Sequence, residues 1–367
     1  MFSALRPFLF NLDPETAHDL AIKSLKFNPL PGKVFEVEDE QILNIKLLGK
    51  NFPNPIGLAA GFDKSAEAYN SLLKLGFGFV EVGTVTPLKQ YGNPKPRIFR
   101  LQEDRALINR LGFNNDGMEA IKARIKSNNK KGILGVNIGP NKETKDQKND
   151  FCLGLKSFFD IADYITINIS SPNTEGLRDF HYQEKLKDLI IALNKVKKDK
   201  ETNIPLLLKI SPDINNGHIP EISDIAIKNN ISAIILTNTT NGNRNNLTSK
   251  FKALNLQLQW VGRTRSDGLK GVGYLSFLIR DKYKPDIKKQ IIHGIFVTVY
   301  DNNMNTRECL GEWFTKNKPW NINIQNKLIQ KVCFLGQTES RLTNGQYLNI
   351  PLSNYTITYL HKKRTNG

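Results

Sequence analysis

Six short apolar runs, each rich in β-branched residues, recur through the middle of the chain with amphipathic stretches between them. The runs are residues 55–59, 79–82, 133–138, 164–169, 206–210 and 233–236. The amphipathic stretches include residues 65–75, 117–126, 183–196 and 219–228. Buried strands that alternate with helices are typical of a parallel sheet with helical crossovers. The pattern therefore predicts an α/β fold, for which we expect a (β/α)8 TIM barrel.

A doubly wound open sheet is the alternative arrangement of the same elements. Sheets of that kind bind dinucleotides through a GxGxxG turn after the first strand. No such motif follows residues 55–59, and Gly76-Phe77-Gly78 is expected to be a turn between a helix and a strand. The sequence thus disfavours a nicotinamide site of the Rossmann type and favours the barrel.

Polar residues of a restricted kind stand at the carboxyl ends of the six runs. They are mostly amides, hydroxyls, small glycines and two lysines, with few carboxylates, at Ala59–Lys64, Gly83–Thr86, Asn109–Asn115, Asn137–Gly139, Asn168–Thr174, Lys209 and Thr237–Thr240. A single asparagine or threonine at such a place is usually a turn or capping residue. In a barrel, however, all these positions meet at one end, where active sites lie. Converging amides suit a flat heterocycle whose edge alternates C=O and N–H groups.

Three of these positions carry a more specific expectation. Lys64 can supply a positive charge for a carboxylate on such a ring. Lys209 can place positive charge where a reduced flavin accumulates negative charge. The small residues Ala59-Ala60-Gly61 allow the backbone to approach a planar ring closely.

Metal, disulfide and membrane-spanning signals are weak. The cysteines, Cys152, Cys309 and Cys333, form no CxxC pair, and the five histidines form no HExxH motif. We therefore expect no metal and a reducing compartment. No apolar run approaches the roughly 18 residues that a spanning helix needs, and the N-terminus lacks the features of a signal peptide.

Nine motifs follow one another in a fixed order along the first two thirds of the chain. They are LDPETAH at 12–18, NPIGLAAGFDK at 54–64, GFGFVEVGTVTP at 76–87, GNPKPRIFRL at 92–101, LINRLGFNN at 107–115, GVNIGPNK at 135–142, YITINISSPNTEGLR at 164–178, LLLKISPD at 206–213 and LTNTT at 236–240. Over about residues 1–250 the chain resembles the class 2, quinone-dependent dihydroorotate dehydrogenases, which are FMN barrels. The serine in NISSPNT is specific, because class 1 relatives carry cysteine there.

The resemblance implies an oxidoreductase that converts (S)-dihydroorotate to orotate in pyrimidine (UMP) biosynthesis. FMN would accept the hydride, and a quinone would then take the electrons. The resemblance also implies three regions: an N-terminal helical, membrane- and quinone-facing extension (1–45), an FMN-binding barrel body with strands 1–6 (46–250) and a divergent basic C-terminal region (251–367).

The resemblance assigns individual residues as well. FMN would be held by Ala60, Gly61, Phe62, Asp63, Lys64, Thr84, Asn137, Asn168, Lys209 and Thr237. Dihydroorotate would be held by Lys64, Asn109, Arg110, Leu111, Gly112, Phe113, Asn168, Asn173, Asn238 and Thr239. Ser171 would be the base that removes a ring proton. Because a serine hydroxyl is a weak base, it needs an assisting partner or a water path, and Thr174 is the candidate.

The N-terminal segment is predicted to form two short helices. Asp13-Pro14 is expected to cap and begin the second, and Ala17, Leu20, Ala21 and Leu25 follow at helical spacing. Spacing alone favours docking on the protein over lying on a membrane. The resemblance instead favours a tunnel for the quinone, and thus peripheral contact with the cytoplasmic side of the cell membrane.

The net charge of +17 is concentrated in the C-terminal region. Residues 251–367 hold 18 of the 52 basic residues but only 7 of the 35 acidic ones. The family's loops for the FMN phosphate should lie here, but the nearest candidate is Asp267–Gly271, and the run 294–300 leads into no glycine-rich turn. We therefore expect strands 7 and 8 to be atypical or incomplete. Three explanations of the region compete. It is a misread or frame-shifted coding sequence, a genuine replacement that closes the barrel differently, or a basic appendage after a truncated barrel. We favour the first.

Two other functions compete with the oxidoreductase. One is an inactive or truncated barrel whose basic tail binds anionic surfaces. The other is an FMN barrel that acts on RNA, such as a tRNA dihydrouridine synthase. Those enzymes use a cysteine acid, whereas Cys152 is expected at the start of a helix and no cysteine stands at a predicted strand end. We therefore expect no nucleic-acid partner.

Overall fold

The structure is a computed structural model that describes residues 10–27, 41–101, 106–215 and 217–240. It also describes the backbone of five short strands in the C-terminal region, namely β11 (Gln257–Gln259), β12 (Gly273–Ile279), β13 (Gln290–Thr298), β14 (Thr356–Tyr359) and β15 (His361–Lys362).

Six parallel strands form the central sheet. In spatial order they are β3 (Ile56–Leu58), β4 (Phe79–Val85), β7 (Ile133–Ile138), β8 (Tyr164–Asn168), β9 (Leu206–Ile210) and β10 (Ala233–Leu236). Each neighbouring pair is parallel, with Glu81 opposite Gly135 and Asn168 opposite Lys209. All six predicted runs are therefore confirmed as strands. Their order along the sheet follows their order along the chain, as in a barrel.

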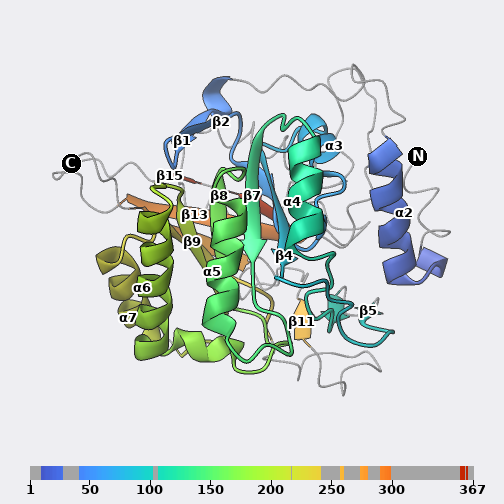
Figure 1. Ribbon diagram of the computed structural model, residues 1–367. Coiled ribbons are helices and arrows are strands. Elements are labelled where there is room, and N and C mark those ends of the chain that lie inside the picture. Colours follow the sequence, from blue (N-terminus) through green and yellow to red (C-terminus); the bar gives the residue numbers. More distant parts are fainter. Residues whose placement is uncertain are drawn as a thin grey trace, which may run out of the picture.

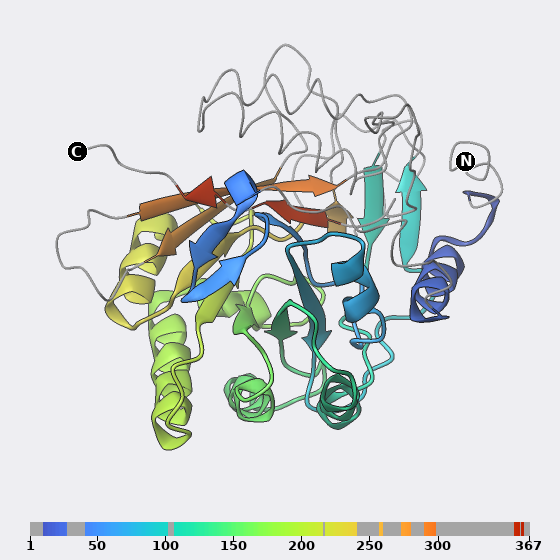
Figure 2. The same ribbon diagram turned by 90° about the horizontal axis from the view of Figure 1, so that it is seen from above.

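Helices connect the strands and cover the outer face of the curled sheet (Figures 1 and 2). They are α3 (Tyr69–Lys74), α4 (Met118–Ser127), α5 (Gln147–Phe158), α6 (Gln183–Asp199) and α7 (His218–Lys228). The 3-10 helix η2 (Gln41–Leu43) precedes the first hairpin, and η3 (Leu177–His181) contacts α6. Four of these helices match predicted amphipathic stretches. The fifth, α5, was expected to start near Cys152 but begins at Gln147, where polar residues interrupt the apolar pattern.

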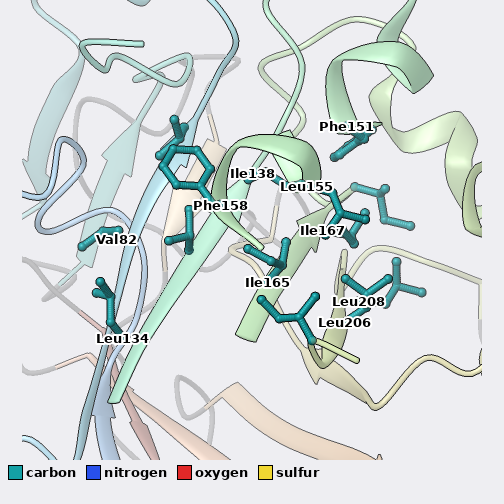
Figure 3. Packing of buried hydrophobic residues seen from close by; sticks show 14 of the residues in the cluster. Val82, Leu134, Ile138, Phe151, Leu155, Phe158, Ile165, Ile167, Leu206 and Leu208 are labelled. Atoms are coloured by element: carbon teal, nitrogen blue, oxygen red, sulfur yellow. The ribbon is translucent and has the colours of Figure 1, made fainter. Parts of the chain in front are cut away.

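The two faces of the strands pack against different cores. Residues such as Val82, Ile165 and Leu208 point outward and pack with Leu155 and Phe158 of α5 in the large core between sheet and helices (Figure 3). This division follows from the alternation of side chains along a strand.

The inward-facing residues at the amino ends of the strands form a second, smaller core. Phe79 and Tyr164 lie in this core. The antiparallel hairpin of β1 (Ile45–Leu47) and β2 (Lys50–Phe52) adds Phe52, whose ring meets Phe79 edge-on with centroids 5.5 Å apart. Because this apolar plug fills the amino end of the interior, polar inward-facing residues are left at the carboxyl end.

Helix α2 (Pro14–Phe27) packs beside the antiparallel hairpin of β5 (Ile98–Leu101) and β6 (Ala106–Asn109) (Figure 2). Asp13 caps α2 as predicted, since its Oδ2 accepts hydrogen bonds from the backbone N–H groups of Glu15 and Thr16 at 3.0 Å. The buried face consists of Glu15, His18 and Ile22, whereas Leu20 is 48% exposed. Most of the first predicted N-terminal helix lies outside the described residues.

The C-terminal strands continue the sheet in antiparallel fashion. β14 pairs with β3, β13 pairs with β14, and β12 pairs with β13 and lies beside β10. β13 covers most of the predicted run 294–300, whereas Asp267–Gly271 lies outside the described residues. The chain thus has the architecture of a (β/α)8 TIM barrel over its first six strands, with atypical C-terminal strands, as expected.

Candidate active site

The predicted cofactor residues Thr84, Asn137, Asn168 and Lys209 are all buried near the carboxyl ends of four strands. All four were expected just past their strands, but they lie within them: Asn168 is the last residue of β8, and the others stand one residue before the end. Asn137, Asn168 and Lys209 share the inward-facing alternation of the apolar plug, and Thr84 joins them by hydrogen bonds, so they line the interior of the barrel.

Three of these side chains form one hydrogen-bond network across β4, β7 and β8. The Thr84 hydroxyl donates to Asn137 Oδ1 at 2.7 Å and accepts from Asn168 Nδ2 at 2.9 Å. Asn168 Oδ1 in turn accepts from the Ser170 hydroxyl at 2.6 Å and the Ser170 N–H at 3.2 Å. Such mutual bonding fixes the orientation of each side chain.

Two further residues of this interior, Glu81 and Thr166, were missed by sequence reasoning. Glu81 Oε1 accepts from Asn137 Nδ2, and Glu81 Oε2 accepts from the Thr166 hydroxyl, both at 2.8 Å. Both lie before the ends of their strands, whereas the predicted residues stand closer to the strand ends or beyond them. The signal was a carboxylate in the middle of an otherwise apolar strand, FVEVGTV, at a position that alternates with apolar neighbours.

Lys209 is 7% exposed and is not a solvated surface lysine. Burial lowers the pKa of its ammonium, while the negative charge of Glu81 opposes that shift. The lysine therefore lies in the same polar layer as Glu81, and its positive charge is balanced from within the interior.

The loop after β3 is shaped by Gly61 and Asp63. Gly61 has φ +115°, and a Cβ there would meet no atom of the described residues within 4 Å, so its surface is open toward them. Its N–H donates to Gly83 O at 2.9 Å, while Gly83 N–H donates to Asp63 O at 3.2 Å. The buried Asp63 carboxylate accepts from the N–H groups of Glu67 and Ala68, both at 2.7 Å. The Asp63 side chain thus holds the turn of the loop itself.

Lys64, the next residue, is half-buried beneath α2. Burial lowers the pKa of its ammonium to about 8, and the carboxylate of Glu15 opposes the shift. Glu15 forms a buried ion pair with Arg97, whose Nε lies 3.0 Å from Oε2. The His18 ring meets Phe62 edge-on with centroids 5.3 Å apart. Helix α2 is therefore packed directly on the loop that carries Lys64.

The predicted substrate stretch 109–113 begins at the last residue of β6 and is held through both backbone and side-chain groups. Gln90 Nε2 donates to Gly112 O at 2.9 Å, and the Arg110 guanidinium donates to Pro96 O at 2.8 Å. A Cβ on Gly139 would lie 2.7 Å from Thr84 Cγ2 and 3.1 Å from Phe113 Cε2. The stretch therefore reaches the Thr84 side of the network.

The loop after β8 places Ser171, which is 3% exposed, beside the network. Its Oγ accepts from the Asn173 N–H at 3.2 Å. Thr174 Oγ1 is buried and has no hydrogen-bond partner among the described residues. Arg178 holds the loop by donating to Ser170 O at 3.1 Å and pairing with Asp213.

The residues after β10 complete the predicted set. Thr237 Oγ1 donates to Asn238 O at 2.8 Å, and the Thr239 N–H donates to Asn238 Oδ1 at 2.8 Å. Thr239 Oγ1 is a second buried hydroxyl without a partner in the described part of the chain. Two orphaned hydroxyls, an open glycine surface and a row of amides fit a flat, hydrogen-bonding ligand.

Other predicted features lie elsewhere. Cys152 is in the middle of α5 and packs in the outer core, so its prediction at the start of a helix was wrong. Among the described residues no group of three or more histidine, cysteine and acidic side chains is arranged to hold a metal. In the same residues no helix has the length and apolar character needed to cross a membrane.

Comparison with known proteins identifies the family. The sequence model of the dihydroorotate dehydrogenase family matches residues 42–262. The chain is 48% identical over 239 residues to the dihydroorotate dehydrogenase (quinone) of Bartonella tribocorum, a match to 64% of this chain and 66%, just under two thirds, of that protein. It is 42% identical to the enzyme of the same name from Idiomarina loihiensis, over 65% of this chain and 74% of that protein.

A solved structure shows the same fold. The structure of DHODH from Eimeria tenella in complex with ferulenol superposes with a TM-score of 0.63 at 38% identity. The superposition covers 67% of this chain and 72% of that chain. With the family match and the geometry of the barrel interior, these similarities establish that the chain belongs to the dihydroorotate dehydrogenase family.

Proposed function

We propose that the protein oxidises dihydroorotate to orotate with bound FMN as the hydride acceptor and a quinone as the electron acceptor. The observation that carries the proposal is the buried Thr84–Asn137–Asn168 network beside Ser171. It gathers amide donors, a weak base and the Lys209 ammonium at the carboxyl end of one barrel, where flavin barrels carry out their chemistry.

FMN would lie along Gly61 and the polar interior. The open surface at Gly61 leaves room for a ring, and the amides of Asn137 and Asn168 offer hydrogen bonds to its edge. FMN supplies the electron-accepting ring, and Lys209 places a positive charge in the same layer. We propose Thr237 and the backbone from Ala60 to Lys64 as further contacts.

Dihydroorotate would lie between this ring and the loop that carries Ser171. Lys64 supplies a cation for the substrate carboxylate, and Asn173 and Asn238 supply amides. Ser171 removes the ring proton, and Thr174 would pass that proton on, because its buried hydroxyl has no partner among the described residues and can bond with a neighbour or a water.

The quinone would approach from the side of α2. Exposed apolar residues Leu12, Leu20 and Phe27 lie on or beside this helix, and Phe27 is 83% exposed. We propose that residues 1–45 contact the surface of the cell membrane peripherally on its cytoplasmic side, with the apolar side chains toward the lipid. We propose no nucleic-acid partner.

The test is to purify the chain, record its visible absorption and measure dihydroorotate-dependent reduction of a soluble quinone. We expect a yellow protein whose flavin is bleached anaerobically by dihydroorotate. Ser171→Ala should keep the flavin but slow bleaching by about 10²- to 10⁴-fold, the usual range for loss of a general base.

Ser157→Ala is the matched control, because Ser157 lies on α5 in the outer layer and bonds to Met118. It should bleach at the wild-type rate. A wild-type protein that binds no added FMN would contradict the proposal as a whole. A Ser171→Ala protein that bleaches at the wild-type rate would contradict only the assignment of the base.

A further inference from the structure

Glu81 is a buried carboxylate in the middle of β4 and is 5% exposed. It bonds to Asn137 on the adjacent strand β7 and to Thr166 on β8, one strand further. The side chain therefore reaches across the barrel interior beneath the amides. A buried charge is tolerated where hydrogen bonds and an opposite charge compensate it, and here two donors and the Lys209 ammonium do so.

An ionised carboxylate can only accept hydrogen bonds, which gives the network a direction. Because Glu81 accepts, Asn137 must turn its amide N–H group toward it and its oxygen toward Thr84. The Thr84 hydroxyl must then donate to Asn137, so its lone pair accepts from Asn168. Asn168 is left with its oxygen toward Ser170.

We propose that Glu81 is a positioning residue that fixes the donor–acceptor direction of the Thr84–Asn137–Asn168 network. Each of the amide nitrogens of Asn137 and Asn168 carries two N–H groups, and the network uses only one of the two. The direction set by Glu81 therefore makes Asn137 and Asn168 donors toward a bound ring with carbonyl acceptors. The identity of that ring as FMN rests on the function proposed above.

A glutamine at position 81 removes this constraint without changing the size of the side chain. Its amide can donate to Asn137 Oδ1, so Asn137 can turn and donate to Thr84, and Thr84 can then donate to Asn168. In the reversed network Asn168 Oδ1 faces Thr84, so it loses the two hydrogen bonds that it accepts from Ser170. A ligand that needs the original direction binds only the fraction of molecules that retain it.

The test is a double-mutant cycle on FMN affinity, measured by quenching of free FMN fluorescence. Glu81→Gln should weaken binding by about tenfold, the usual scale for losing a hydrogen bond to a charged group. Glu119→Gln, on the exposed first turn of α4, makes the same chemical change away from the site and should bind like wild type.

The second arm of the cycle is Thr84→Val, which removes the hydroxyl that links Asn137 to Asn168. Glu81 bonds to Asn137 directly, so only the part of its effect that reaches Asn168 passes through this hydroxyl. The loss of FMN affinity in Glu81→Gln/Thr84→Val should therefore be smaller than the product of the two single losses. If the two changes act independently, their effects multiply, and the proposal is overturned.

A neutron crystal structure of the deuterium-exchanged wild-type protein reads the direction without a variant or a ligand. Deuterium on Asn137 Nδ2 facing Glu81, and on Thr84 Oγ1 facing Asn137, is the expected result. A deuterium on the Glu81 carboxyl that points at Asn137 Oδ1 would refute the inference. This measurement decides the role of Glu81 even if Glu81→Gln fails to fold or FMN does not bind, and the latter failure would count against the proposed function alone.

Discussion

Replacing Asp63 by asparagine tests how the loop that carries Lys64 is held. Burial raises the pKa of the Asp63 carboxyl from 3.8 to about 6, although backbone N–H groups of Ala68 and Glu67 bond to it and oppose the shift. Between these two values the folded protein therefore binds a proton that the unfolded chain has released. Stability must fall as pH rises through that window, because the folded state loses its advantage in proton binding.

The magnitude follows from the two pKa values. At 1.36 kcal/mol per unit, the shift corresponds to roughly 3 kcal/mol, which is present in full below pH 3.8 and absent well above pH 6. Between pH 7.5 and pH 5 the linkage relation gives a change of about 1.4 kcal/mol. An asparagine side chain does not titrate, so this part of the pH dependence disappears in the Asp63→Asn variant.

The assay is urea unfolding of wild type and Asp63→Asn at several pH values between 7.5 and 5. The difference between their free energies of unfolding should move by about 1.4 kcal/mol in favour of wild type as pH falls. Contributions from other groups cancel in this difference. Asp188→Asn, an exposed change on α6, should show no such trend. A difference that stays constant across the range would refute a raised pKa at Asp63.

Three further changes follow from the structure. His181 Nε2 accepts from a backbone N–H and burial lowers the pKa of the ring, so stability should fall as pH drops below 6.5, and His181→Gln should flatten that fall in urea unfolding. Gly135→Ala should lower the melting temperature strongly, because its Cβ would lie 2.1 Å from a tyrosine ring, whereas Gly217→Ala should not. Asp13→Ala removes the cap of α2, so it should cost about 1 kcal/mol in unfolding and speed proteolysis of that helix.

The six strands could be predicted because each is short, apolar and β-branched and is followed by a polar turn. The start of helix α5 and the β5–β6 hairpin could not, for different reasons. The helix has a weak apolar pattern around Gly154, and tertiary packing of Phe151 and Leu155 stabilises it instead. In the sequence, the hairpin cannot be distinguished from a long loop between β4 and α4, because its strands are short and lie outside the parallel sheet.

The polar residues near the carboxyl ends of the strands could be predicted, but the polar residues deeper in the candidate site could not. Amides at strand ends form a visible pattern, and Asn168 follows it. Glu81 and Thr166 lie earlier in their strands, and their roles depend on which strands are neighbours across the barrel. That information is three-dimensional, since β4 and β8 are separated by β7 in the sheet.

Lys64 is the point at which the N-terminal segment and the barrel interior meet. The charge that opposes the effect of burial on its pKa is Glu15, which belongs to α2. Glu15 is in turn held by Arg97 just before β5, so the charge beside Lys64 depends on contact between α2 and the β5–β6 hairpin. A chain that formed its barrel without docking α2 would leave Lys64 without this counter-charge and without the burial that α2 adds, so both opposing effects on its pKa depend on α2. Helix α2 is therefore part of the electrostatic environment of the site, whatever surface its exposed face also contacts.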